Sequence, residues 1–265
     1  MISPALKALW NYRGFILGSV KREFQSKYTN SMLGVGWAVI QPLTMIFVYT
    51  VIFSQLMRAR LPGVEGTFGY SIYLCVGVIA WGYFAEIVGR AQSIFIDNAN
   101  LIKKLSFPRL CLPVTLMLNA SVNFGIIFSL FIIFLLVTGN FPGWVFFTII
   151  PILLVQVLFA IGLGVTLGVL NVFFRDVGQL VGVALQFWFW FTPIVYPLNI
   201  LPAWLQALMK LNPMATVIGS YQGVMVNGHM PDWVALLPVA LLSLFMCFLG
   251  LRLFKKHSGE LVDEL

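Results

Sequence analysis

Six apolar segments, each close to or above the roughly 20 residues that a helix needs to cross a hydrocarbon core, constrain this chain more than any other feature. They lie at residues 35–57, 68–88, 110–137, 144–174, 177–196 and 233–254. Because 60% of the residues are hydrophobic and only 9% are charged, the composition lies outside the range of soluble domains. We therefore expect an all-α integral membrane protein, with six transmembrane helices in one domain that covers residues 1–265.

The positions of lysine and arginine predict how this domain is oriented. If both termini face the cytoplasm, only Arg58, Arg60 and Lys210 fall on the external side, and the other 13 of the 16 basic residues are cytoplasmic. Such a bias follows the positive-inside rule and requires an even number of crossings. The net charge of +7 is spread in small clusters beside apolar segments, so it argues against a nucleic-acid partner.

A short polar stretch at residues 98–109, reading NANLIKKLSFPR, carries Lys103, Lys104 and Arg109 between the second and third apolar segments. Asn98 or Asn100 can cap a short helix there, and a proline at position 108 cannot continue it. Two interpretations are open. The stretch is either one more basic loop that fixes topology, or a handle by which a soluble partner moves the flanking helices. The sequence as a whole favours the handle.

Residues 10–28 precede the first apolar segment and predict an amphipathic helix that lies in the membrane interface. Apolar residues recur at helical spacing, at Leu17, Val20, Phe24 and Tyr28. The remaining surface carries four cations, Arg13, Lys21, Arg22 and Lys27. This helix is either a basic anchor on anionic lipid, which we favour slightly, or a gate beside a cavity entrance that attracts a phosphate-bearing substrate.

Two connections between segments stand out. Arg175 and Asp176 occupy the tip of a hairpin between the fourth and fifth segments, and they are either a second partner contact or two solvated turn charges. The external region at residues 197–232 contains LPAWLQALMKLNP and MATVIGSYQGVMVNG, which break at positions 212–213 and 227–228. Both pieces are too short to span, so we expect two short re-entrant or interfacial helices.

Aromatic residues are dense in the fifth segment, where positions 187–191 read FWFWF. Five consecutive residues at about 100° each go right round a helix, so they cannot all face one medium. Aromatic faces suit the stacking of sugar rings, whereas an interfacial belt with ordinary packing accounts for residues such as Trp188, Trp204 and Tyr196. Both interpretations are open, and the candidate pathway residues are Tyr49, Phe187, Trp190, Phe191 and Tyr196.

Prolines and glycines inside the segments predict local packing. Pro42 and Pro193 invite kinks, which free backbone carbonyls that neighbouring groups must satisfy. Two small-residue pairs permit close helix contact, although the signal is weak. The pairs are Gly164 with Gly168, and Gly178 with Gly182.

The sequence lacks chemistry of its own. The phosphate-binding pattern GxxxxGK[ST] is absent, and the three cysteines and two histidines lack disulfide or metal-ligand spacing. Glu86 is the sole acidic residue inside a segment, and it can pair with Arg90 at the i, i+4 spacing. Energy for any movement must therefore come from another polypeptide. Six helices make a thin wall for a wide pathway, so we expect a homodimer.

Several stretches together resemble one family. They are NYRGFILGSVKREFQSKYTNSMLGVGWAVIQPL near the N-terminus, NANLIKKLSFPRLCLP, FFRDVGQL leading into FWFWFTPIVYP, and LNPMATVIGSYQ. In this order they are similar to the membrane subunits of polysaccharide-exporting ABC transporters of the type-2 exporter class, above all those that export lipid-linked O-antigen. The resemblance covers nearly the whole chain.

The resemblance implies a homodimer in the bacterial inner membrane, bound to two copies of a separate ATPase that holds ATP and Mg²⁺. This chain would then be no enzyme and hold no cofactor. Residues 98–109 would be the coupling helix, with contacts at Lys103, Lys104, Phe107, Pro108 and Arg109. The helix at 10–28 would be a gate near the diphosphate of a polyprenyl-linked polysaccharide, and the two external pieces would cap the channel exit.

Three alternatives are open. Capsule and teichoic-acid exporters share these motifs, so the cargo could be either polymer. A permease for a smaller lipid or drug belongs to the same class. A passive channel or ion-coupled carrier, which needs no ATPase, belongs to a different one.

Overall fold

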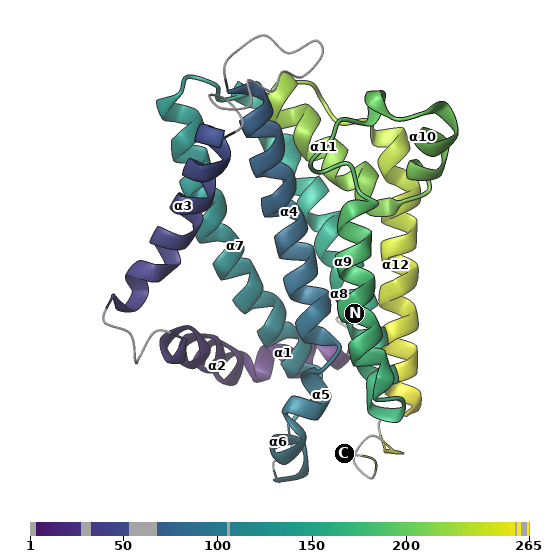
Figure 1. Ribbon diagram of the computed structural model, residues 1–265. Helices are drawn as coiled ribbons and strands as arrows, with labels where there is room; N and C mark the ends of the chain where they lie inside the picture. Colours follow the sequence, from purple (N-terminus) through teal and green to yellow (C-terminus); the bar gives the residue numbers. More distant parts are fainter. Residues whose placement is uncertain are drawn as a thin grey trace.

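The computed structural model describes residues 4–27, 33–52, 68–104, 107–257, 259–260 and 264, and within these ranges the regular structure is entirely helical (Figure 1). The α-helices are α1 (Pro4–Asn11), α2 (Arg13–Ser26), α3 (Trp37–Thr50), α4 (Gly69–Ala91), α5 (Ile94–Asp97), α6 (Ala99–Lys104), α7 (Cys111–Val137), α8 (Ile149–Phe173), α9 (Asp176–Trp190), α10 (Ala203–Met209), α11 (Pro213–Asn227) and α12 (Trp233–Lys256).

Four of the six expected spans are confirmed as helices that are long and apolar enough to cross a membrane. They are α4, α7, α12, and α8 together with the short 3₁₀ helix Gly143–Thr148 that leads into it. The first expected span is represented by α3, which is apolar but shorter, and positions 53–57 of that prediction lie outside the described residues. The count of six crossings stays a prediction.

The fifth expected span is shorter than the range 177–196 that the sequence indicated. Helix α9 ends at Trp190, so it is about 22 Å long. Pro193, which follows, has no N–H to donate and cannot continue the helix. Two carbonyls at this end gain side-chain donors, because Thr192 donates to the Trp188 carbonyl at 2.8 Å and Asn212 to the Phe191 carbonyl at 3.0 Å.

Helix α4 forms the centre of the bundle, with α8 and α11 packed against it and α7 crossing it on another side (Figure 1). The approach of α8 depends on glycine. A Cβ atom at Gly164 would lie 2.6 Å from the Ala91 Cβ, and one at Gly168 would lie 2.5 Å from the Ala91 carbonyl oxygen. This small-residue pair is therefore confirmed, whereas Gly182 of the second pair faces open space and makes no such contact.

Helices α10 and α11 lie together at one end of the bundle, which we call the α11 end (Figure 1). The expected breaks are confirmed. Asn212 caps α11 by accepting the Met214 N–H at 3.0 Å, Pro213 occupies its first turn, and Gly228 ends it with a left-handed φ of 61°. These are favourable residues for helix starts and stops. That both pieces are re-entrant stays a prediction.

At the opposite end, which we call the handle end, α1 and α2 lie crosswise to the long helices and α5 and α6 project beyond the bundle (Figure 1). Helix α2 packs on α7, as expected of a helix that does not cross. Ile16 is buried and Leu17 is 61% exposed, because the contact with α7 comes from one side while the other side stays open. Tyr28 lies outside the described residues.

Candidate functional site

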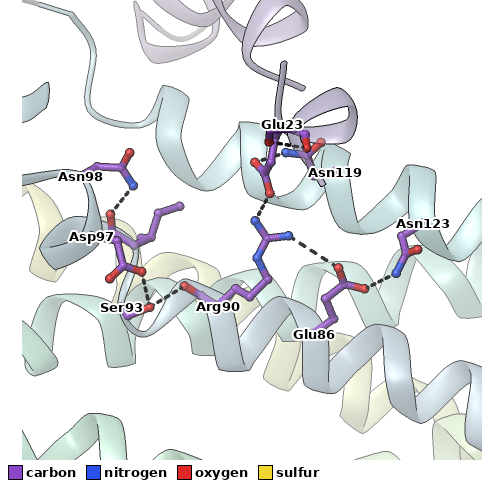
Figure 2. Close-up of polar contacts among 10 residues, drawn as sticks. Glu23, Glu86, Arg90, Ser93, Asp97, Asn98, Asn119 and Asn123 are labelled. Carbon is purple, nitrogen blue, oxygen red and sulfur yellow. Dashed lines mark hydrogen bonds and ion pairs between the residues drawn. The ribbon is translucent and has the colours of Figure 1, made fainter. Parts of the chain in front are cut away.

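The predicted handle, residues 98–109, begins at the end of α5 and includes α6. From here on we use the name handle for α5 with α6, residues 94–104, which are held by local polar contacts (Figure 2). Ser93 donates to the Asp97 carboxylate at 2.7 Å, and the Asn98 side chain donates to the Ile94 carbonyl at 2.8 Å. The Asn98 side chain thus closes α5 through its nitrogen, and the expectation that Asn98 or Asn100 caps the next helix with its side chain stays a prediction. The main-chain carbonyl of Asn98 accepts the first bonds of α6, from Leu101 and Ile102 at 3.0 Å.

The handle has an anchored base and a charged tip. Phe95 is buried and stacks on Phe254 of α12 with ring centroids 5.6 Å apart, and Ile102 is also buried. Lys103 and Lys104, by contrast, are exposed at the end of α6. The structure thus presents two adjacent cations on a short, anchored projection, which is the geometry that a docking handle requires.

The remaining residues of the predicted handle contact this chain itself. Phe107, Pro108 and Arg109 are each half-buried. The Phe107 ring lies 5.3 Å from the Phe15 ring of α2, centroid to centroid, and the Pro108 carbonyl accepts the Cys111 N–H at 2.8 Å where α7 begins. The segment after the handle therefore joins it to both α2 and α7.

The predicted hairpin tip is confirmed as an exposed turn between α8 and α9, with both Arg175 and Asp176 exposed. Asn171 fixes its base. That side chain donates to the Gln92 carbonyl at 2.9 Å and to the Gln92 side chain at 2.7 Å, and it accepts the Gly178 N–H at 2.9 Å. One buried amide thus ties the ends of α4, α8 and α9 together beside the handle.

A polar cluster that the sequence analysis missed joins α2 to the bundle (Figure 2). Glu23 of α2 forms an ion pair with Arg90 of α4 and accepts a hydrogen bond from Asn119 of α7. Arg90 also lies 3.6 Å from Glu86, as its i, i+4 spacing predicted, and Glu86 accepts from Asn123 at 2.9 Å. Two signals in the sequence were available. Glu23 is an acid among the cations of α2, and Asn119 and Asn123 lie four positions apart in an apolar segment.

Two open clefts flank this cluster and share Glu23, Ser26 and Arg90 as lining residues. One has a volume of about 590 Å³ and lies between α2, α5 and α7, and the other has a volume of about 340 Å³. Arg22 lines the first cleft and Lys27 the second. Because Glu23, Glu86 and Asp97 also line these walls, the clefts are of mixed charge rather than uniformly basic.

The other two predicted gate cations lie apart from the clefts. Arg13 donates to the Trp10 carbonyl at 3.1 Å and places its guanidinium 5.2 Å from the Trp10 ring centroid, a cation–π contact. Lys21 is exposed and is absent from the lining of either cleft. The structure therefore brings two of the four cations to the clefts and leaves two on the outer surface of α1 and α2.

The aromatic run of α9 divides between inside and outside, as its helical geometry requires. Trp188 packs inward, with its ring centroid 6.2 Å from that of Phe159 and 5.3 Å from that of Phe84, which agrees with the ordinary packing that was one of its two interpretations. The predicted pathway residues of this run, Phe187, Trp190 and Phe191, are each more than half exposed. Of the other two, Tyr196 donates to the Trp190 carbonyl at 2.6 Å and Tyr49 packs partly buried against the core.

Comparison with known proteins assigns the chain to a family. Residues 16–226 match the ABC-2 type transporter family, a range that includes most of α2 and α11, the handle, and all but one of the residues that line the two clefts. The chain belongs to this family. The match begins after Arg13 and Phe15 and ends before α12, so these two residues and the support that Phe254 gives to the handle lie outside the matched range.

Three relatives of this ABC-2 protein carry names that concern polysaccharides. The O-antigen export system permease protein RfbA of Myxococcus xanthus is 28% identical over 98% of both chains. A protein of the same name from Klebsiella pneumoniae is 29% identical over 92% of both. The polysialic acid transport protein KpsM of Escherichia coli is 19% identical over 92% of this chain and 93% of its own length.

Proposed function

We propose that this chain is the channel-forming membrane subunit of an ATP-driven exporter, which moves polyprenyl-diphosphate-linked polysaccharide of the O-antigen type from the cytoplasm across the inner membrane. The observation that carries this proposal is the similarity to O-antigen export permeases over 98% of both chains. Because the similarity is continuous, it includes the handle and the clefts and is not confined to the apolar helices.

The energy for export comes, in this proposal, from a separate ATP-binding subunit with its Mg²⁺. A homodimer of this chain would present two handles to two such subunits, with both termini in the cytoplasm. Lys103 and Lys104 suit docking because they are exposed on an anchored projection. Arg175 and Asp176, exposed on the neighbouring hairpin, would supply a second contact.

The cargo would enter at the handle end. Arg22 and Lys27 line the two clefts there and can pair with the diphosphate. Arg13 and Lys21, on the outer surface, would attract the same anion or the anionic headgroups around it. The exposed aromatic side chains of α9, Phe187, Trp190 and Phe191, would line the pathway formed with the second copy, where sugar rings can stack on them.

The test is purification of the tagged chain from its native membrane, followed by an ATPase assay with and without lipid-linked polysaccharide. We expect an ATPase subunit at equal stoichiometry, with a rate that responds to the polysaccharide. A partner whose rate ignores the polysaccharide would contradict the cargo and favour a smaller lipid or drug. Absence of any ATPase partner would contradict the exporter itself.

A capsule polymer is the second candidate cargo, favoured by the similarity to a polysialic acid transport protein. That similarity is weaker than the one to the O-antigen permeases, so we place it second. Supplying the purified complex with neutral O-antigen-type and acidic capsule-type lipid-linked glycans in parallel distinguishes the two. Stronger stimulation by the acidic glycan would reverse the order.

A further inference from the structure

Arg90 lies between two carboxylates that belong to different elements (Figure 2). Its Nη2 atom contacts Glu23, which comes from α2, and its Nη1 atom lies 3.6 Å from the Glu86 Oε1 atom, which comes from its own helix one turn earlier. The first contact is a direct charged hydrogen bond, whereas the second is longer. At present Arg90 is therefore paired mainly with α2, and a second partner stands within reach.

Each carboxylate is also held by an amide of α7. Asn119 donates to Glu23, and Asn123, one turn further along, donates to Glu86 at 2.9 Å. The contacts of Glu86 with Arg90 and Asn123 thus come from α4 and α7 and do not involve α2. Glu23, in contrast, reaches its two partners only while α2 lies against α4 and α7.

In this arrangement the charge of Arg90 keeps a carboxylate partner if α2 moves away from the bundle. An arginine whose partner is removed normally leaves a poorly solvated charge without compensation. Here the guanidinium, with 41% of its side chain exposed, already lies 3.6 Å from Glu86, so it keeps a carboxylate partner when Glu23 leaves. Glu23 would lose both of its partners, and Asn119, a residue that is only 8% exposed, would lose the acceptor of its amide, which favours return of α2.

Movement of α2 away from the bundle would change the two clefts that flank the ion pair. Glu23 and Arg90 line both of them, so the ion pair stands on their common border. Separating the pair would join the two clefts into one opening between α2, α4 and α7. The Phe15–Phe107 ring contact connects α2 to the segment that follows the handle, so a displacement of the handle can reach α2 directly.

We propose that Glu23 is a positioning residue that latches α2 onto the bundle, and that Arg90 is a two-position switch which exchanges Glu23 for Glu86 when α2 moves away. The latch itself is a property of this chain. Its role in export, which is to hold the entrance closed until the ATPase subunit moves the handle, rests on the proposed function.

The latch is tested by hydrogen exchange on the full chain in lipid nanodiscs, comparing the wild type with Glu23→Gln and with the matched variant Glu86→Gln. Released from the bundle, a 14-residue helix is marginal alone, so its amides exchange faster. We expect residues 13–26 to exchange about threefold to tenfold faster in Glu23→Gln, the range for losing one partly exposed charged hydrogen bond. Exchange of α12 should not change.

In Glu86→Gln the second partner of Arg90 is lost, so α2 should exchange at the wild-type rate or more slowly. Equal acceleration in both variants, no acceleration in Glu23→Gln, or acceleration of α12 as well would each overturn the proposal. Should Glu23→Gln fold poorly, Glu23→Asp keeps the charge on a shorter side chain and should give the same pattern with a smaller acceleration.

The consequence for export is measured separately on the complex with its ATPase subunit. Glu23→Gln should raise ATP hydrolysis in the absence of cargo, and Glu86→Gln should slow export without doing so. If α2 responds in hydrogen exchange but no variant or wild-type complex exports lipid-linked polysaccharide, the latch stands and the proposed function fails. If export occurs but α2 does not respond, the latch alone is wrong.

Discussion

The two ends of the bundle are held together by different chemistry. At the α11 end, hydroxyl and amide side chains donate to backbone carbonyls. Tyr73 donates to the Pro193 and Tyr196 carbonyls at 2.9 and 3.0 Å, and Asn212 donates to the Phe191 carbonyl. At the handle end, Asn171 makes a bond of the same kind to the Gln92 carbonyl, but α2 is joined to the bundle by side chain-to-side chain contacts, the Glu23–Arg90 ion pair and the Asn119–Glu23 hydrogen bond.

This difference indicates which end is built to move. A side chain bonded to a backbone carbonyl has a partner that shifts only if the chain itself unwinds. An ion pair with a second carboxylate nearby can change partners while its helices stay intact, at an energy that surface exposure keeps small. We therefore expect substitutions at the α11 end to change stability, and substitutions at the handle end to change coupling to the ATPase subunit.

The largest effect is expected at the α11 end, from Trp188→Ala. The indole packs against the Phe84 and Phe159 rings and donates to the Asn212 side chain at 2.8 Å. Its removal should lower the free energy of unfolding by about 3 kcal/mol, mainly through lost packing, with a smaller loss from the hydrogen bond to Asn212. Thermal denaturation in detergent measures this. A loss of export at unchanged stability would contradict a structural role for Trp188.

The double variant Lys103→Glu/Lys104→Glu should have the next largest effect, and on coupling. Reversing two exposed cations on the handle repels an acidic docking surface, so we expect polysaccharide-stimulated ATP hydrolysis to fall about tenfold to a hundredfold. Thermal stability should not change, because both side chains are exposed. The matched control is Lys210→Glu at the α11 end, which should alter neither. Full stimulated activity in the double variant would remove the docking role.

A smaller effect is expected from Tyr73→Phe, which removes the hydroxyl and keeps the ring. Loss of its two carbonyl contacts should cost about 1–2 kcal/mol of stability, seen as a lower melting temperature. ATP hydrolysis per folded complex should equal that of the wild type. A change in polysaccharide-stimulated ATP hydrolysis without a change in melting temperature would contradict the different roles assigned to the two ends.

The smallest effect is expected from Trp190→Ala, on the outward side of α9. This side chain is 59% exposed, so stability should change by less than about 0.5 kcal/mol. If it lines the pathway, export should slow about threefold from the loss of one stacking surface. Polymer export per milligram of membrane-inserted chain is the measurement, and equal losses of export and expression would assign Trp190 to packing.

Much of the fold could be predicted because the length of an apolar segment and the proline, glycine or asparagine residues that end a helix are local signals. The four longest spans, the breaks at Asn212–Pro213 and Asn227–Gly228, and the hairpin at Arg175 all follow from residues close in sequence. The end of α9 was predicted too late, because the apolar run continues past Pro193 and hydropathy does not register a missing N–H donor.

The candidate site was predicted only in part, for a different reason. Basic residues were visible as charges, and Lys103 and Lys104 are exposed, while their docking role stays a prediction. Glu23 was passed over because its partners lie 67 and 96 positions away in sequence, and no local pattern indicates them. The clefts are lined by both acidic and basic residues. Which charges meet there depends on how distant helices pack, and no local sequence pattern predicts that packing.

The most direct test of the account is ATP-dependent transport in proteoliposomes that contain this chain, its co-purified ATPase subunit and lipid-linked polysaccharide. We predict that ATP moves the glycan to the opposite side of the bilayer, that a non-hydrolysable analogue does not, and that the chain without the ATPase subunit moves none. Transport by the chain alone, at a rate that ATP leaves unchanged, would contradict the exporter and establish a passive pathway.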